Sequence, residues 1–433
     1  MNDQIEKSPT AETQTPPSFG EAARYWIKLG FMSFGGPAGQ IAIMQTECVD
    51  KRGWLSQGAF LRGLNYSMLL PGPEAQQLAA YIGWRLHGVK GALFAGTAFF
   101  IPGTFLMIFL AWVAAAHGDD GFVSAIFHGI KPVVIAIVIS AVYRIGKKTC
   151  NGIVPLALAI GAFAALQFTE TPFPVVVLVA GIAGVAIAKF KPDALSSGHD
   201  DHAAPKAETP GASQTSGASK RIILITAIFA VALIGPSLLA ISVLGAEPFS
   251  DVIKLFTTAA FVTFGGAYAV LPFVADASVN TYGWLTGAEM INGLALAETT
   301  PGPLILVTTY VGFFAGWSAE GAVLGVIAAL VTTYVTFLPS FYLIIVGAPY
   351  VESVQRFAWA RNALSAITAA VVGVILSLAF FLGQAALFDT AGDVQWLSVA
   401  AAVVALGLLI SNRVSVPMLV ALGAAFGVAT SFI

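Results

Sequence analysis

The amino-acid sequence predicts an all-α polytopic membrane protein built from two inverted-topology repeats. The first observation is composition: 57% of the 433 residues are hydrophobic and only 10% are charged, whereas soluble domains carry about 25% charged residues. The second is that many apolar runs reach the roughly 20 residues that a helix needs to cross about 30 Å of hydrocarbon. The third is a repeat of glycine and proline motifs inside those runs, which predicts broken or re-entrant helices.

The repeat has a constant offset along the chain. Each half carries Phe-Gly-Gly, then Gly-Trp-Leu, then Pro-Gly-Pro, beginning at positions 34, 53 and 71 in the first half and at 264, 283 and 301 in the second. Gly91-Ala92 and Gly321-Ala322 keep the same offset. We therefore expect two copies of one module, aligned without a gap across these motifs.

The chain divides into five regions. Residues 1–18 form a polar tail, which we expect to be disordered and to contain no cleavable signal peptide. The modules occupy residues 19–191 and 247–433. A flexible cytoplasmic linker, 192–219, rich in Pro, Ser, Gly and Ala, and a linking transmembrane helix, 220–246, join them.

Each module is expected to contribute six membrane segments, so that the linking helix brings the total to about 13. The first-module segments are the interrupted 22–46 and 58–84, then 91–116, 124–146, 151–167 and 173–190. The linking helix lies near 222–244, and the second-module segments are 256–275, the broken 287–314, 321–346, 363–388, 394–411 and 414–433. Lys131-Pro132 resembles a helix start, which gives the segment at 124–146 a later alternative beginning.

Positive charge orients this arrangement. With a cytoplasmic N-terminus, the loops 117–121, 168–172, 316–320 and 388–393 lie outside and contain no Lys or Arg. The cytoplasmic ends receive Arg85, Lys90, Arg144, Lys147, Lys148, Lys189, Lys191, Lys220, Arg221, Arg356, Arg361 and Arg413. This follows the positive-inside rule, inverts the second module and puts the C-terminus outside. If both interrupted segments of each module are re-entrant hairpins and not crossings, every later loop stays on the same side of the membrane, and Lys51 and Arg52 become cytoplasmic. The crossing and the re-entrant versions both stay open.

The helix breaks are the predicted binding site. Lipid cannot satisfy the backbone groups of a broken helix, so a break must face protein or water. Helix N-termini that begin there offer free N–H groups and a partial positive charge to an anion. The candidate substrate-binding backbone residues are Gly35, Gly36, Pro71, Gly72, Pro73, Gly265, Gly266, Pro301, Gly302 and Pro303. The alternative is that these residues only permit kinks or close helix packing.

Few ionisable or polar side chains accompany the breaks. Arg62 is the expected cation for a divalent oxyanion, with Lys28 next, and Asn65, Gln76 and Gln77 are further candidate substrate-binding residues. Glu74 and Glu298 suit coupling to a proton or another cation, because an ionised carboxylate repels an anion. The structural alternatives are an Arg62 that extends its head group to the membrane interface and a Glu74 that caps its helix.

Other features point away from catalysis. We expect no catalytic residues, metal site or cofactor: the sequence contains no HExxH, GxSxG or P-loop motif. His199-Asp200-Asp201-His202 lies in the flexible linker and is expected to be solvated, and Cys48 and Cys150 are expected to be free thiols. Nothing in the composition, with a net charge of −2, indicates a nucleic-acid partner.

With these motifs in place, the chain resembles the CHR family of chromate ion transporters in its long, two-module form. The resemblance rests on FMSFGGPAGQIAIMQTECVDKRGWL and LLPGPEAQQLAAYIG in the first module, and on FVTFGGAYAVLPFVADASVNTYGWL and TTPGPLILVTTYVGFFAG in the second. It covers residues 28–102 and 254–316. It implies secondary, gradient-driven export of chromate through the bacterial cytoplasmic (inner) membrane and chromate resistance, with sulfate as the natural competitor.

Alternatives remain open. The same fold fits a transporter of sulfate or another anion, and a membrane-embedded enzyme that uses Glu74 and Glu298 as an acid/base pair is the hypothesis from a different class. The coupling ion and the choice between monomer and homodimer are left open. The second module has Leu304-Ile305-Leu306-Val307 where the first has Glu74-Ala75-Gln76-Gln77. We therefore expect the first module to carry most of the polar, substrate-facing role.

Overall fold

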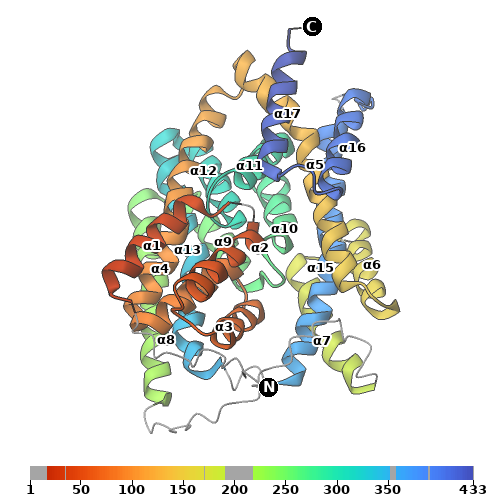
Figure 1. The fold of residues 1–433 in the computed structure, drawn as a ribbon. Coiled ribbons are helices and arrows are strands. Elements are labelled where there is room, and N and C mark those ends of the chain that lie inside the picture. The colour runs from red at the N-terminus through yellow and green to blue at the C-terminus, as the bar shows by residue number, and fades with distance from the viewer. Residues whose placement is uncertain are drawn as a thin grey trace, which may run out of the picture.

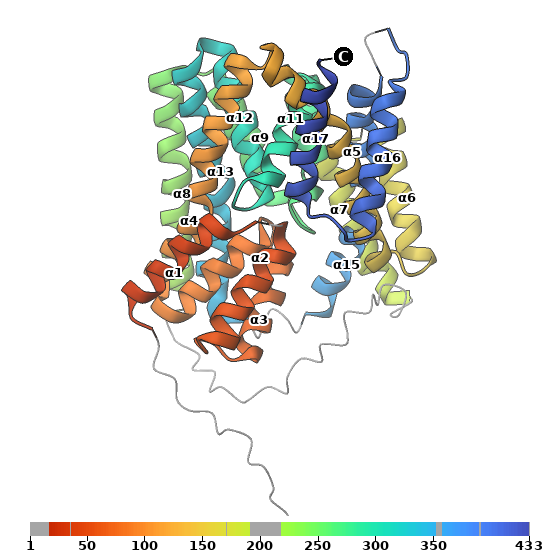
Figure 2. The ribbon, with the colours of Figure 1, turned by 45° about the horizontal axis from the view of Figure 1, so that its top comes forward.

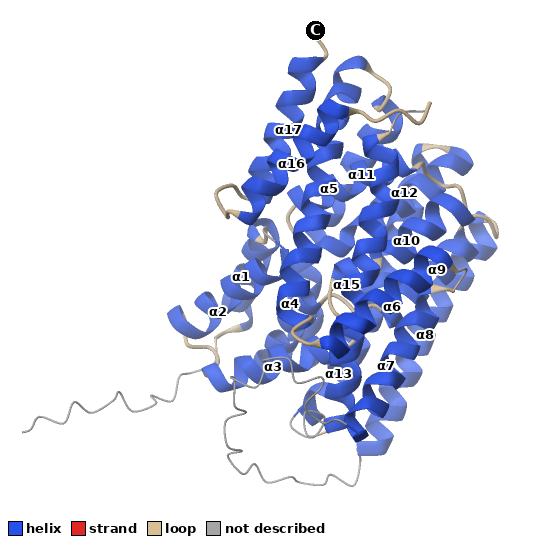
Figure 3. Ribbon diagram, turned by 90° about the vertical axis from the view of Figure 1, so that its right-hand side faces the viewer, coloured by secondary structure: helices blue, strands red, loops and turns tan. Residues whose placement is uncertain are grey.

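The computed structural model describes residues 17–34, 36–169, 171–190, 218–351, 357–388 and 391–432. Within these ranges the secondary structure is helical, apart from turns and one isolated bridge between Phe388 and Val394 (Figure 3). Six of the described helices are long and apolar enough to cross a membrane. The chain is therefore an all-α, multi-pass membrane protein. Most of the predicted tail, nearly all of the predicted linker with its His199–His202 cluster, and Gly35 lie outside the described residues.

The first half contains seven helices in the described ranges: α1 Phe19–Met32, α2 Gly36–Gln45, α3 Gln57–Leu69, α4 Glu74–His117, α5 Gly121–Thr149, α6 Ile153–Phe168 and α7 Phe173–Phe190. α8, Ala218–Leu244, links the halves. The second half consists of α9 Phe249–Val262, α10 Leu271–Asp276, α11 Gly287–Thr299, α12 Val307–Glu320, α13 Ala322–Gly347, α15 Ala358–Leu387, α16 Trp396–Ile410 and α17 Val416–Thr430. The alternative start at Lys131-Pro132 was wrong, because α5 continues through Pro132.

The repeat is visible in the backbone. Both ends of α9 are displaced from those of α1 by the same offset as the sequence motifs, and the same holds for α11 and α3. Ser56 and Thr286 cap the equivalent helices α3 and α11 by accepting a hydrogen bond from the N–H three residues later. A short π-helix precedes each cap, at Thr46–Lys51 and Ala277–Thr281. In these elements the local structure thus follows the sequence repeat.

The alignment changes where each module reverses direction. In the first module the reversal is at Gly88, with φ +63° and ψ −149°, inside the continuous stretch labelled α4. In the second it is at Gly321, with φ +79° and ψ −153°. Gly88 is thus the structural counterpart of Gly321, and the gap-free pairing of Gly91 with Gly321 was wrong. The positive φ explains why glycine occupies both reversal positions.

The interrupted segments fold back as hairpins. At the base of the first hairpin, Arg52 Nη1 lies 3.6 Å from Glu21 Oε1, so the chain returns to the level at which α1 begins. The next hairpin packs Gly63 of α3 directly against the ring of Tyr81 in α4, and Gly293 of α11 packs in the same way against Tyr310 of α12. Figure 2 shows α1, α2 and α3 gathered at the end of the molecule opposite the C-terminus.

The halves interlock rather than fold separately. α5 of the first half packs against α16 and α17 of the second, and α15 of the second packs against α6 and α7 of the first (Figure 1). Glycines allow close approach at these crossings: Gly129 of α5 meets the backbone of Gly423 and Gly427 in α17. The hairpins and α4, α8, α9, α12 and α13 make up the rest of the bundle, where Phe100 and Phe337 stack with ring centres 4.0 Å apart. The site described next lies where the two halves meet.

Candidate functional site

The four helix breaks meet through two equivalent backbone hydrogen bonds. The Gly72 N–H donates to Thr263 O at 2.8 Å, and the Gly302 N–H donates to Ser33 O at 3.0 Å. Ser33 and Thr263 directly precede the two Phe-Gly-Gly motifs, and the two donors, like the two acceptors, are equivalent positions of the repeat. Each Pro-Gly-Pro turn is thus tied to the Phe-Gly-Gly break of the other module. Two of the backbone groups released by the breaks are therefore satisfied across the interface between modules.

Glycine is required at both turns. Gly72 has φ +122° and Gly302 has φ +105°, backbone conformations that residues with a Cβ rarely adopt. A Cβ on Gly72 would lie 2.5 Å from Ser340 Oγ, and one on Gly302 would lie 2.9 Å from Leu306 Cδ1. α4 also approaches closely, since a Cβ on Gly103 would lie 2.0 Å from Pro301 O.

Two buried glutamines of the first module hold the turns. Gln40, in α2, donates from Nε2 to Ser33 O at 3.0 Å and to Gly302 O at 2.7 Å. Gln77, in the first turn of α4, donates from Nε2 to Pro71 O at 2.7 Å, with Ser340 Oγ at 3.5 Å. Gln76 beside it is fully buried, and neither of its amide atoms has a partner among the described residues. Gln40 was not predicted from the sequence, because a single amide in an apolar helix gives no distinctive signal.

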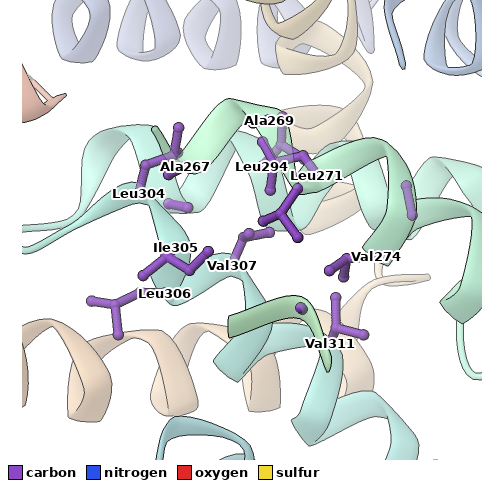
Figure 4. Close-up of a cluster of buried hydrophobic side chains, with 14 of the residues drawn as sticks. Ala267, Ala269, Leu271, Val274, Leu294, Leu304, Ile305, Leu306, Val307 and Val311 are labelled. Carbon is purple, nitrogen blue, oxygen red and sulfur yellow. The ribbon is translucent and has the colours of Figure 1, made fainter. Parts of the chain in front are cut away.

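The second module replaces these side chains with apolar ones. The positions equivalent to Gln40, Gln76 and Gln77 are Val270, Leu306 and Val307, all fully buried. Figure 4 shows Leu304, Leu306 and Val307 packed together in a purely apolar cluster. The side chains packed around the breaks therefore differ between the two modules at these positions.

Both candidate coupling carboxylates lie against the second module's break. The Glu74 carboxylate oxygens are 3.7 and 3.9 Å from the point that a Cβ on Gly266 would occupy. The Glu298 carboxylate accepts a hydrogen bond from the Tyr268 hydroxyl, two residues beyond Gly266. The charge of Arg144, an exposed residue near the end of α5, acts on both Tyr268 and Glu298. The glutamates thus come from different modules but surround one short segment, and neither Tyr268 nor Arg144 was among the predicted site residues.

The remaining predicted side chains lie farther along α3. Arg62 is half-buried and Asn65 is exposed, and Arg62 Cα lies about 10 Å along the helix axis from the last residue, Leu69. One turn beyond Arg62, the Tyr66 hydroxyl donates to Leu343 O at 3.0 Å and so ties α3 to α13. Lys28 is exposed on α1.

The first module's break is accessible. Phe34 is 42% exposed, and a Cβ built on Gly36, which has φ +71°, would meet no atom within 4 Å. α2 begins at Gly36, so its first N–H groups adjoin this open space. The arrangement offers one accessible helix N-terminus and two carboxylates within a tightly packed crossing of four breaks. Such a constellation suits binding and release of an ion; in the described residues no group of three or more His, Cys, Asp or Glu side chains gathers to hold a metal.

Comparison with known proteins agrees with the motifs. A family model described as chromate transporter matches residues 20–185 and 250–428. The chromate transport protein of Pseudomonas aeruginosa is 29% identical over 411 residues, covering 92% of this chain and 88% of that protein. The chromate transport protein of Cupriavidus metallidurans is 26% identical over 419 residues, covering 96% and 94%, and the probable chromate transport protein of Synechococcus elongatus is 26% identical over 373 residues, covering 86% of each. No solved structure matches the chain. Because the family model spans most of both halves, the protein belongs to the chromate transporter family.

Proposed function

We propose that this protein is a secondary active transporter that exports chromate through the bacterial cytoplasmic membrane and so confers chromate resistance. The cargo follows from the family and from relatives named as chromate transport proteins. One structural observation carries transport as such: helix breaks from two repeated modules are hydrogen-bonded to each other at one place, beside two carboxylates. Inverted repeats that build a single midplane site provide two alternating gates.

The proposed topology contains re-entrant hairpins. With a cytoplasmic N-terminus, the first two hairpins return to the cytoplasmic side and keep Lys51 and Arg52 there. Four crossings follow: the part of α4 after Gly88, then α5, α6 and α7. α8 then crosses to the outside, so that the second module begins there. Nine crossings and four hairpins replace thirteen crossings, and the C-terminus stays outside. The position of α3 at one end of the molecule and of the C-terminus at the other supports this assignment.

The charges of the two sets of hairpins support export. Residues 19–90 contain seven Lys or Arg and four Asp or Glu, a net charge of +3, whereas the equivalent residues 249–320 contain one and five, a net charge of −4. The positive-inside rule accounts for the cations but not for the outside acids, because Asp and Glu contribute little to insertion. A field of this sign attracts an oxyanion from the cytoplasm and a cation from outside.

Binding and coupling are assigned to different residues. The helix starts beside the breaks supply N–H donors, and Arg62 supplies the full positive charge that a dianion needs on leaving water. Glu74 and Glu298 bind and release the coupling ion. Tyr268 and Arg144 interact with the Glu298 carboxylate and sense its change of charge. Sulfate shares the charge and shape of chromate, and it is the alternative cargo on the same site.

The test is uptake into everted membrane vesicles at controlled pH and membrane potential. Chromate should accumulate when a gradient is imposed, sulfate should compete, and the chromate should be recovered chemically unchanged. Uptake that ignores both gradients contradicts the secondary mechanism, and conversion of the anion would favour the enzyme alternative. A reporter fused after Ile433 that proves cytoplasmic contradicts the inverted topology.

A further inference from the structure

Several fully buried polar atoms of α4 and α13 have no partner in the described part of the chain. They comprise both amide atoms of Gln76, Oε1 of Gln77, and the hydroxyls of Thr332 and Thr336 in α13. Leaving such an atom unsatisfied is destabilising, and about nine in ten buried polar groups in proteins have a partner. Several together, at the interface of two modules, point to small polar occupants, and water is the smallest of these.

The hydroxyls follow one face of α13. Thr332, Thr336 and Ser340 are spaced four residues apart, which places them on one face with a rise of about 6 Å between neighbours. A water that bridges two hydroxyls by hydrogen bonds of about 2.8 Å each spans about 4.6 Å at its usual tetrahedral angle and at most about 5.6 Å. Connecting neighbouring hydroxyls of α13 therefore takes about two waters per turn.

The hydroxyl line leads to Glu74. Ser340 Oγ lies 3.5 Å from Gln77 Nε2, and Gln77 is three residues beyond Glu74, on the same face of α4. The groups around Glu74 are the backbone at Gly266 and, beyond it, Tyr268 with Glu298 and Arg144. Glu74 is thus the titratable group at one end of the line, and Thr332 lies at the other.

The first module has no equivalent line. Counted from the reversal glycines Gly88 and Gly321, the α4 positions that match Thr332, Thr336 and Ser340 are Phe99, Gly103 and Met107. In contrast, Gln76 and Gln77 exist only in the first module. Each module thus contributes half of the polar groups, which make one path and not two.

We propose that Thr332, Thr336, Ser340 and Gln77 hold a chain of water that carries the coupling proton between the outer half of α13 and Glu74. The proposal rests on the proposed function and specifies its coupling ion. A proton enters one water while another leaves it toward the next, so hydroxyls and waters each accept one hydrogen bond and donate one. The proton ends on a Glu74 carboxylate oxygen, and net transport requires that it then leaves Glu74 toward the cytoplasmic side.

The first test measures hydration without transport. In a Cys48→Ser, Cys150→Ser background, Thr336→Cys and Thr332→Cys are compared with Val335→Cys, which is equally buried on α13, using a small water-soluble methanethiosulfonate. The hydrated path predicts that the two threonine positions react about tenfold faster or more, a difference of roughly 1.4 kcal/mol. Equal rates at all three positions overturn the proposal, whatever the cargo is.

The second test measures proton movement with chromate flux in proteoliposomes. Thr336→Val keeps the side-chain shape and removes the hydroxyl, and we expect protons moved per chromate to fall about tenfold while chromate binding is retained. The control is Thr104→Val in α4, because the buried Thr104 hydroxyl is already bonded to Phe100 O at 3.1 Å. Unchanged proton movement in Thr336→Val overturns the path. If the parent protein moves no chromate, that result contradicts the proposed function and not the path. The reaction rates of the cysteine variants still show whether the path is hydrated.

Discussion

Replacing Gly103 by alanine tests the close packing of α4 on the second Pro-Gly-Pro turn. In an isolated helix this change stabilises by about 1 kcal/mol, since alanine is the better helix former. Here the new Cβ would lie 2.0 Å from Pro301 O, whereas a carbon–oxygen contact needs about 3.3 Å. α4 and the turn must therefore separate by about 1.3 Å. Overpacking of this kind costs about 1–3 kcal/mol, and the shift weakens the bond between Gly302 N–H and Ser33 O. We expect a net loss of about 1–3 kcal/mol.

The matched control has the opposite expected sign. Gly161 lies inside α6, and a Cβ built on it meets no atom within 4 Å, so Gly161→Ala should stabilise by up to about 1 kcal/mol. Thermal unfolding of the purified variants in one detergent gives the stabilities, and vesicle flux gives the functional effect. A Gly103→Ala protein that is as stable and as active as Gly161→Ala refutes the proposed packing at the break.

Three further substitutions examine the side chains of the site. Gln40→Leu should lower the unfolding temperature and cost about 1–3 kcal/mol, because Gly302 O loses its side-chain donor and Ser33 O keeps only the Gly302 N–H. Gln45→Leu, at the end of the same helix, is the control, and equal temperatures contradict the bridging role. Arg62→Gln should weaken chromate binding to the purified protein about tenfold to a hundredfold, and Arg62→Lys should weaken it by less. If Arg62→Gln binds chromate as tightly as the parent protein, the cation that binds chromate lies elsewhere. Glu298→Gln should retain chromate binding but alter the dependence of chromate flux on pH or membrane potential. Tyr268→Phe should alter this dependence to a smaller extent. Unchanged dependence in both variants would mean that Glu298 and Tyr268 have a structural role only.

The sequence was most informative where structure is local. The break motifs, the capped start of α3 and α11 and the ends of α1 and α9 depend on backbone preferences of a few adjacent residues, so the constant offset of the motifs transferred directly to the helices. The boundary between the predicted segments 58–84 and 91–116 contains the reversal, but Gly88 itself was missed because the constant offset of the motifs paired Gly91 with Gly321. Counting charges could not distinguish re-entrant hairpins from crossing segments, because both arrangements leave the later loops on the same sides of the membrane.

Partners across the bundle could not be predicted in the same way. Glu298 is conspicuous because it is a carboxylate in an apolar helix, but its contact with Tyr268 depends on how α11 meets the second break. Arg144 was counted only as a positive charge at a helix end, because nothing local indicates that α5 carries it toward Glu298. Arg62 remains a prediction based on charge alone.

The contrast between backbone and side chains explains how a duplicated protein can hold one site. Both cross-module hydrogen bonds, from Gly72 to Thr263 and from Gly302 to Ser33, use backbone atoms, so duplication preserves them whatever the neighbouring side chains are. Polar side chains are under no such constraint: the glutamines lie on the first module and the α13 hydroxyls on the second. A dianion and a coupling cation are attracted by side chains of opposite charge. Two half-sites with identical side chains would not distinguish the two ions. On the proposed function, symmetric turns with asymmetric side chains would allow the two halves to move as equivalent gates while only one arrangement of charges meets the cargo.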